Sequence, residues 1–158
     1  MVWNCRPVIL LEYVKRTIMK YPVKFIEDGE GWIAIFPDLP EAIASANTKE
    51  ETLKRAKIAL IASLGFYFDN NRTVPMPSKA SPKESCVTLP PSLWAKVLLL
   101  NEMLVQQIKP VELARRLNKT PQAVNRIREL HHPTKIDTLA SAYSALGKEL
   151  VLTLADKN

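Results

Sequence analysis

Residues 110–130, Pro-Val-Glu-Leu-Ala-Arg-Arg-Leu-Asn-Lys-Thr-Pro-Gln-Ala-Val-Asn-Arg-Ile-Arg-Glu-Leu, predict two short helices joined by a tight turn. Asn118 follows the first apolar stripe, and Asn tolerates the positive φ that such a turn needs. Thr120 is a suitable N-cap for the second helix, and Pro121 suits its first position. This is the form of a helix-turn-helix, which places its second helix in the DNA major groove.

Both expected helices have an apolar inner face at helical spacing, formed by Val111, Leu113, Ala114 and Leu117 in the first and by Val124, Ile127 and Leu130 in the second. The residues left outward near the start of the second helix are our base-reading candidates: Gln122, Ala123, Asn125 and Arg126. Gln and Asn side chains can pair with adenine edges, and Arg can pair with guanine. The candidates for phosphate contacts are Arg115, Arg116, Lys119, Thr120, Arg128 and Lys135.

An ordinary helical hairpin with a solvated basic face is the alternative interpretation of this stretch. The turn chemistry, the N-cap and the outward Gln, Asn and Arg together favour DNA binding. The charge distribution agrees, because residues 19–80 have no net charge whereas residues 81–158 carry a net charge of +4.

Composition restricts the class of protein further. A chain of 158 residues, 47% of them hydrophobic, can build one ordinary domain or two small ones. No apolar run reaches the length of a membrane span. Cys5 and Cys86 form no CxxC pair, so we expect reduced thiols and a cytoplasmic location. His131 and His132 are adjacent and lack a carboxylate or Cys partner, so they make a poor metal site, and we expect them to serve as a helix C-terminal partner or as a phosphate neighbour beside Lys135. We expect neither a metal nor a cofactor.

The folded part of the chain is expected to start at Met19, with residues 1–18 as an N-terminal extension outside the fold. Residues 21–25, 32–36 and 42–46 alternate or run apolar as strands. Thr48 and Glu51 form a capping box before a long helix. The inner face of that helix is formed by Leu53, Ala56, Leu60, Leu64 and Tyr67, and Asp69-Asn70-Asn71 ends it. One helix leaves much of three strands uncovered, so a fourth strand, a dimer or a partner is needed.

Residues 81–92 are a Pro- and Ser-rich linker in which Cys86 to Leu89 can form a short strand. The next helix has an inner face of Leu93, Val97, Leu100 and Leu104. Thr134 is the expected cap of a last helix that ends at Gly147, with an inner face of Ile136, Leu139, Ala140, Tyr143 and Leu146. Leu150, Leu152 and Leu154 then alternate as a final strand. That strand packs on its own domain or pairs with a second copy, and we expect a homo-oligomer, either a dimer or a tetramer.

The fold class is therefore α+β: a small N-terminal antiparallel sheet with one covering helix, and a C-terminal all-α helix-turn-helix domain, residues 93–158, ending in a short strand.

Three pieces of the sequence from Met19 onward form a recognisable pattern: Gly31-Trp32-Ile33-Ala34-Ile35-Phe36-Pro37-Asp38-Leu39-Pro40, Thr48-Lys49-Glu50-Glu51-Thr52-Leu53 and Ala56. In these residues the chain resembles the HicB antitoxin family. Residues 131–137 and 145–150 resemble the subgroup with a Cro/C1-type helix-turn-helix in place of a ribbon-helix-helix. Pro110 and Pro121 stand where Cro-like proteins often carry Gln, so base reading shifts to Gln122, Asn125 and Arg126.

The resemblance implies a reduced ribonuclease H-like domain over residues 19–80 that binds and silences a HicA-type toxin, a small ribonuclease that cuts mRNA. It also implies that the C-terminal half binds operator DNA and represses the shared operon. The family is regarded as non-catalytic, and no spacing in this sequence forces the carboxylates of Asp38, Glu41, Glu50, Glu51 and Asp69 together as a two-metal nuclease requires. The alternative function is a plain helix-turn-helix repressor whose sheet domain only oligomerises or senses a ligand.

Overall fold

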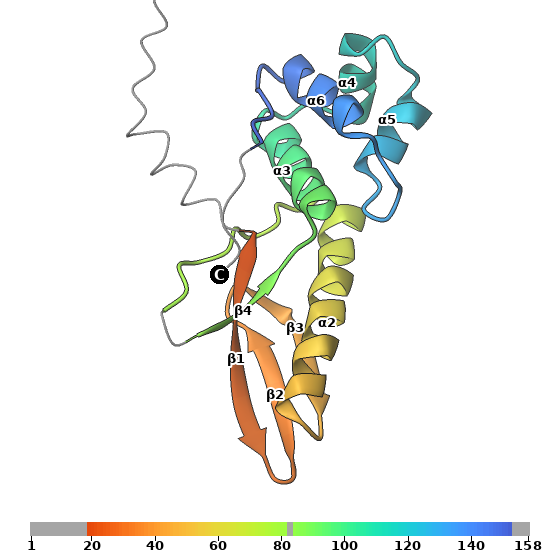
Figure 1. Ribbon diagram of the computed structural model, residues 1–158. Coiled ribbons are helices and arrows are strands. Elements are labelled where there is room, and N and C mark those ends of the chain that lie inside the picture. The colour runs from red at the N-terminus through yellow and green to blue at the C-terminus, as the bar shows by residue number, and fades with distance from the viewer. Residues whose placement is uncertain (1–18, 82–83, 153–158) are drawn as a thin grey trace, which may run out of the picture.

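Four antiparallel strands and five helices form the part of the chain described by the computed structural model, which is residues 19–81 and 84–152 (Figure 1). The strands are β1 (Lys20–Asp28), β2 (Gly31–Phe36), β3 (Leu39–Ala46) and β4 (Ser85–Thr88). The helices are α2 (Lys49–Asp69), α3 (Pro91–Val105), α4 (Pro110–Arg116), α5 (Pro121–Arg128) and α6 (Ile136–Ala145). The predicted α+β class is confirmed, and the expected extension at residues 1–18 lies outside the described residues.

The sheet has the strand order β3-β2-β1-β4. Gly29, with a φ of +60°, makes the tight turn between β1 and β2, which pair with Lys24 opposite Ile35. The pairing of β2 with β3 shifts register between Ile35 and Phe36. β4 pairs with the first half of β1, so the segment expected to be a linker supplies the fourth strand that the exposed sheet required.

One face of the sheet packs against α2 and forms the larger core. Alternate strand residues are buried there, among them Tyr21, Val23, Ala34, Phe36, Ala42 and Ala44. The helix contributes Ala56, Leu60, Leu64 and Tyr67, as predicted. Leu53 was wrongly placed on this face, because its side chain is 40% exposed while that of Thr52 is fully buried. Thr52, Ala56 and Leu60 lie four residues apart, and Leu53 stands about 100° around the helix from that stripe.

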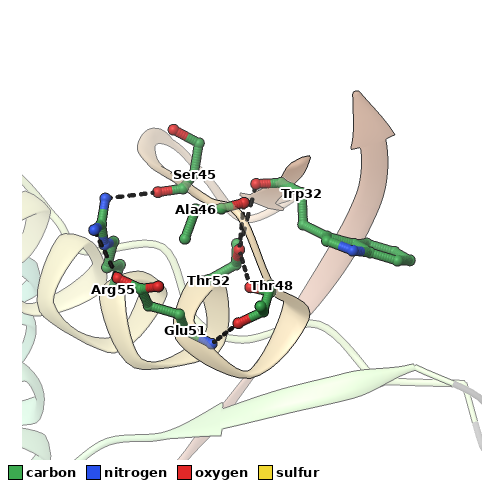
Figure 2. Close-up of polar contacts among 7 residues, drawn as sticks. All are labelled: Trp32, Ser45, Ala46, Thr48, Glu51, Thr52 and Arg55. Atoms are coloured by element: carbon green, nitrogen blue, oxygen red, sulfur yellow. Dashed lines mark hydrogen bonds and ion pairs between the residues drawn. The ribbon is translucent and has the colours of Figure 1, made fainter. Parts of the chain in front are cut away.

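A set of polar contacts fastens the start of α2 to the strands (Figure 2). The Thr48 hydroxyl accepts a hydrogen bond from the Glu51 backbone N–H at 3.3 Å, which confirms the predicted cap. The Glu51 carboxylate accepts from the Arg55 guanidinium at 2.7 Å, which in turn donates to the Ser45 carbonyl at 3.1 Å. The Thr52 hydroxyl donates to the Thr48 carbonyl at 2.8 Å and lies 3.3 Å from the carbonyl oxygen of Trp32.

Helix α3 is shared by two cores and lies between the sheet layer and helices α4–α6 (Figure 1). Trp94, Val97 and Leu100 pack into the core of the sheet, whereas Ala95, Leu99 and Met103 pack with α4–α6. Leu130, which follows α5, also enters the core of the sheet. The described residues thus form two clusters that meet on a single helix.

The Lys96 side chain, 2% exposed, bridges the same junction. Its ammonium donates hydrogen bonds to the carbonyl oxygens of Glu129 and His132 and lies 3.5 Å from that of Leu130. Burial lowers the pKa of Lys96 from its usual value near 10.5, and the nearby Glu129 carboxylate partly opposes this shift. These carbonyls follow the last turn of α5, where no helical N–H remains to pair with them.

Four expectations for the C-terminal half were wrong. Val111 and Ile136 were expected in the core but are 65% and 46% exposed, because each lies in the first turn of its helix, turned away from the apolar stripe. Lys135, not Thr134, is the N-cap of α6, since the Thr134 hydroxyl donates to the His132 carbonyl. Residues 148–152 form no strand in the structure, and Leu154 lies outside the described residues. A strand needs a neighbouring strand for its backbone hydrogen bonds.

The Thr52 hydroxyl provides a test of how α2 is joined to the sheet. Thr52→Val keeps the shape of the side chain and removes its hydrogen bond in a buried site, so the free energy of unfolding should fall by about 1–2 kcal/mol. Urea denaturation followed by circular dichroism measures this loss. Ser144→Ala, on the exposed side of α6, should change the same quantity by less than about 0.5 kcal/mol. Equal stabilities of the two variants would contradict this role of Thr52.

Candidate nucleic-acid interface

Helices α4 and α5 form the two-helix unit that the sequence predicts. Asn118 has a φ of +51°, as the turn requires. The Lys119 N–H donates to the Ala114 carbonyl at 2.9 Å, which closes the end of α4. Ala114 is only 1% exposed, so a small side chain stands in the core between the helices. The two helices are therefore held in one arrangement by the turn and by the core.

Helix α5 directs its polar residues outward. The Thr120 hydroxyl accepts from the Ala123 N–H at 3.2 Å, which confirms the predicted cap, and Pro121 follows as the first helical residue. Val124 and Ile127 are buried as expected. The base-reading candidates lie on the opposite side and within the first two turns: Gln122, Asn125 and Arg126 are exposed, and Ala123 is half-buried.

An open hollow of about 260 Å³ lies beside α5, between this helix and the chain that leads into α6. Three predicted DNA-contacting cations, Lys119, Arg126 and Lys135, line it. The hollow therefore collects positive charge next to the outward side chains of α5, as an anion-binding surface requires. The start of α6 also borders it, and no side chain caps the free backbone N–H groups at this helix end.

Two further polar side chains line this hollow, His132 and Thr138. For His132, its place close to Lys135 in the sequence was the signal that suggested a phosphate neighbour. Thr138 had no such signal, because it reaches the hollow only when the chain after α5 folds back into α6.

Arg115 and Arg116 are held in place by an acidic neighbour. The Arg115 guanidinium donates to both carboxylate oxygens of Glu112, at 2.9 and 2.8 Å, and that of Arg116 donates to one of them at 2.9 Å. Arg116 also donates to the Ala145 carbonyl at 3.1 Å. These two guanidinium groups lower the pKa of Glu112 to about 2. Each arginine is therefore partly neutralised, and Arg116 joins α4 to the end of α6.

Arg128 is not brought together with the other candidates. Its guanidinium donates a hydrogen bond to the Asn71 side chain, just beyond α2. Its Nε is buried without a partner among the described residues, and burial lowers the pKa of the guanidinium. Arg128 thus connects the end of α5 to the sheet half, away from Lys119 and Lys135.

Three of the acidic residues considered for nuclease chemistry, Asp38, Glu41 and Glu51, make contacts within the fold. The Asp38 carboxylate accepts from the Ser78 N–H and hydroxyl at 2.9 and 3.1 Å, and that of Glu41 accepts from the Tyr67 hydroxyl at 3.0 Å. Within residues 19–81 and 84–152, no group of three or more His, Cys, Asp or Glu side chains is placed to hold a metal ion. None of the helices described is both long and apolar enough to cross a membrane.

Comparisons with known proteins show that the sequence of this chain is similar to those of antitoxins. Residues 20–98 match the family described as the HicB-like antitoxin of bacterial toxin–antitoxin systems. Antitoxin HicB 2 of Photorhabdus laumondii is 49% identical over 134 residues, which are 85% of this chain and 95% of that protein. Antitoxin HicB of Escherichia coli K12 is 42% identical over 137 residues, which are 86% of this chain and 99% of that protein. These relatives are named as antitoxins, a family not known for enzymatic activity, which confirms the non-enzymatic prediction.

The pKa of Glu112 provides a test of the charge pairing on α4. Because the folded-state pKa is lowered, the stabilisation from this carboxylate is present above its unfolded pKa of about 4.5 and is lost as the pH falls towards 2. Carboxyl NMR should therefore show Glu112 titrating near pH 2. In the double variant Arg115→Gln/Arg116→Gln the midpoint should move up towards 4.5. The same midpoint in both proteins would exclude the pairing.

Proposed function

The chain belongs to the HicB-like antitoxin family, and from this we propose that it neutralises a cognate HicA-type, mRNA-cleaving toxin and represses its own operon by binding operator DNA. Its N-terminal sheet domain is assigned to the toxin, and its C-terminal helices are assigned to the operator as a Cro/C1-type helix-turn-helix. Both activities would take place in the cytoplasm.

The observation that supports operator binding best is the joint surface of α5 and its adjacent hollow. Gln122, Asn125 and Arg126 are exposed together, and Lys119 and Lys135 lie beside them on the hollow. Side chains that can read base edges therefore stand next to cations that can hold phosphates, and recognition of a DNA duplex requires both. A homodimer or a tetramer would set two α5 helices about one turn of DNA apart, roughly 34 Å.

A repressor whose sheet domain only oligomerises or senses a ligand is the second candidate function. The surface of α5 supports this repressor equally well, because both candidate functions include DNA binding and differ only in the role of the sheet domain. Family membership favours the antitoxin, and the response of a toxin to the sheet domain separates the two candidates.

Base reading by α5 predicts that variants at base-reading residues change the base preference of the protein, whereas a variant at a phosphate-contacting residue does not. Gln122→Ala and Arg126→Ala should each weaken operator binding by about 5- to 150-fold and change the base preference. Lys135→Ala should weaken binding to all duplexes alike and reduce its salt dependence by about one phosphate contact. Fluorescence anisotropy with operator and scrambled duplexes, at several salt concentrations, measures both effects.

Lys57→Ala is the matched control for these variants, because Lys57 is an exposed cation on α2. It should leave operator binding within about 2-fold of that of the unaltered protein. Unchanged operator affinity in the double variant Gln122→Ala/Arg126→Ala would exclude α5 as the reading helix.

Toxin neutralisation is tested with a purified HicA-type ribonuclease. The full chain should form a stable complex with that ribonuclease and abolish its cleavage of a labelled mRNA, as followed by gel electrophoresis and size-exclusion chromatography. An operator-binding chain that neither binds nor inhibits the ribonuclease would establish the repressor and exclude the antitoxin.

A further inference from the structure

The sheet face opposite α2 carries a group of isoleucines that no core of the molecule uses. Strand alternation places Ile26, Ile33, Ile35 and Ile43 on this face, and Lys24 pairs with Ile35, which pairs with Ile43. None of the four isoleucines belongs to either hydrophobic cluster of the described residues. Ile26 and Ile43 are 48% and 59% exposed. We define these four residues as the isoleucine face.

An open hollow adjoins the isoleucine face where β1 loses its neighbour. β4 pairs only with residues 20–23 of β1, so the outer edge of residues 24–28 has no partner strand among the described residues. The hollow has a volume of about 380 Å³, and its lining includes Ile26 and Ile35 together with the cations Lys24 and Lys49. An apolar surface next to an open recess is the usual form of a protein-docking site.

The end of the isoleucine face is acidic. The β1–β2 hairpin ends in Glu27, Asp28, Gly29 and Glu30, all of them exposed. Asp28 lies two residues beyond Ile26 and so shares its face. No ion pair among the described residues involves these three carboxylates. This end is therefore suited to a positively charged partner.

The outer side of α2 also exposes apolar side chains, and the charges beside Ile58 are positive. Ile58 and Phe66 are 69% and 48% exposed there. Lys54 and Lys57 flank Ile58, and both are exposed. A basic partner would meet like charge beside Ile58 and unlike charge at the hairpin end of the isoleucine face, beyond Lys24, so charge favours that end of the face.

We propose that the isoleucine face is the docking surface for a small, basic, RNA-cleaving toxin, with apolar toxin residues on the isoleucines and toxin cations at Glu27, Asp28 and Glu30. This inference rests on the proposed antitoxin function. A ribonuclease must carry cations to hold the RNA backbone, so acidic groups beside the docking surface attract the part of the toxin that its activity needs.

The test compares two exposed isoleucines. Ile43→Asp places a charge on the isoleucine face, and Ile58→Asp places the same charge on the outer side of α2. Titration calorimetry with the purified HicA-type ribonuclease should show at least about 30-fold weaker binding for Ile43→Asp. Ile58→Asp should stay within about 3-fold of the unaltered chain. Operator affinity, measured on the same samples, should be unchanged in both variants and shows that they are folded.

A second pair of variants keeps the proposal testable if Ile43→Asp fails to fold. Glu27→Gln/Glu30→Gln should slow association with the ribonuclease by about tenfold at low salt, with little change in dissociation. Glu50→Gln/Asp69→Asn, at the two ends of α2, removes the same charge from exposed sites outside the isoleucine face and should slow association much less. Stopped-flow fluorescence measures these rates, and equal rates for the two double variants would overturn the charge assignment.

The other outcomes identify which idea fails. Full toxin binding by Ile43→Asp overturns the docking surface and leaves the antitoxin function intact, and a loss confined to Ile58→Asp moves the site to α2. No binding by the unaltered chain overturns the proposed function itself. Conversion of an oligomer to a monomer by Ile43→Asp, with toxin binding retained, shows that the face joins copies of this chain.

Discussion

The buried ammonium of Lys96 is the contact that joins the two halves of this protein. The carbonyls of Glu129, Leu130 and His132 follow the end of α5 and lie against α3, and that of Glu129 also accepts from the His132 N–H at 3.2 Å. A buried carbonyl without a donor costs about 1–3 kcal/mol, so the donors of Lys96 stabilise this position of the segment after α5. The Lys96 ammonium supplies donors, and its charge is tolerated in this site because it is hydrogen-bonded to two of these carbonyls. The orientation of α5, and with it of Gln122 and Arg126, depends on this contact.

The apolar packing around Lys96 has the same effect. α3 gives one face to the sheet core and another to the C-terminal helices, and Leu130 extends the second half into the first. Arg128 adds a polar contact with Asn71 at the end of α2. The reading surface is therefore positioned by the sheet half as well as by its own small core.

Local signals predicted much of this structure, and contacts between distant residues explain what they missed. Asn118, Thr120 and Thr48 were assigned correctly because turns and caps depend on a few neighbouring residues. Leu53 was assigned to the core because it is apolar, but the buried position belongs to its neighbour Thr52. The Thr52 hydroxyl can be buried because the carbonyls of Trp32 and Thr48 accept its hydrogen bond. Lys96 gave no local sign of burial, since its carbonyl partners lie 33 to 36 residues away in sequence. The base-reading candidates were predicted from their positions around the expected helix. The hollow beside them could not be predicted in this way, because it depends on how the chain runs from α5 to α6.

The division of α3 between two cores also limits how such a protein can be recombined. A graft that exchanged the C-terminal module at residue 91 would remove Trp94, Val97, Leu100 and Leu130 from beneath the sheet and leave its apolar residues open to water. A crossover before β4 would remove a strand as well. A replacement of this module therefore has to bring a new cover for the sheet with it.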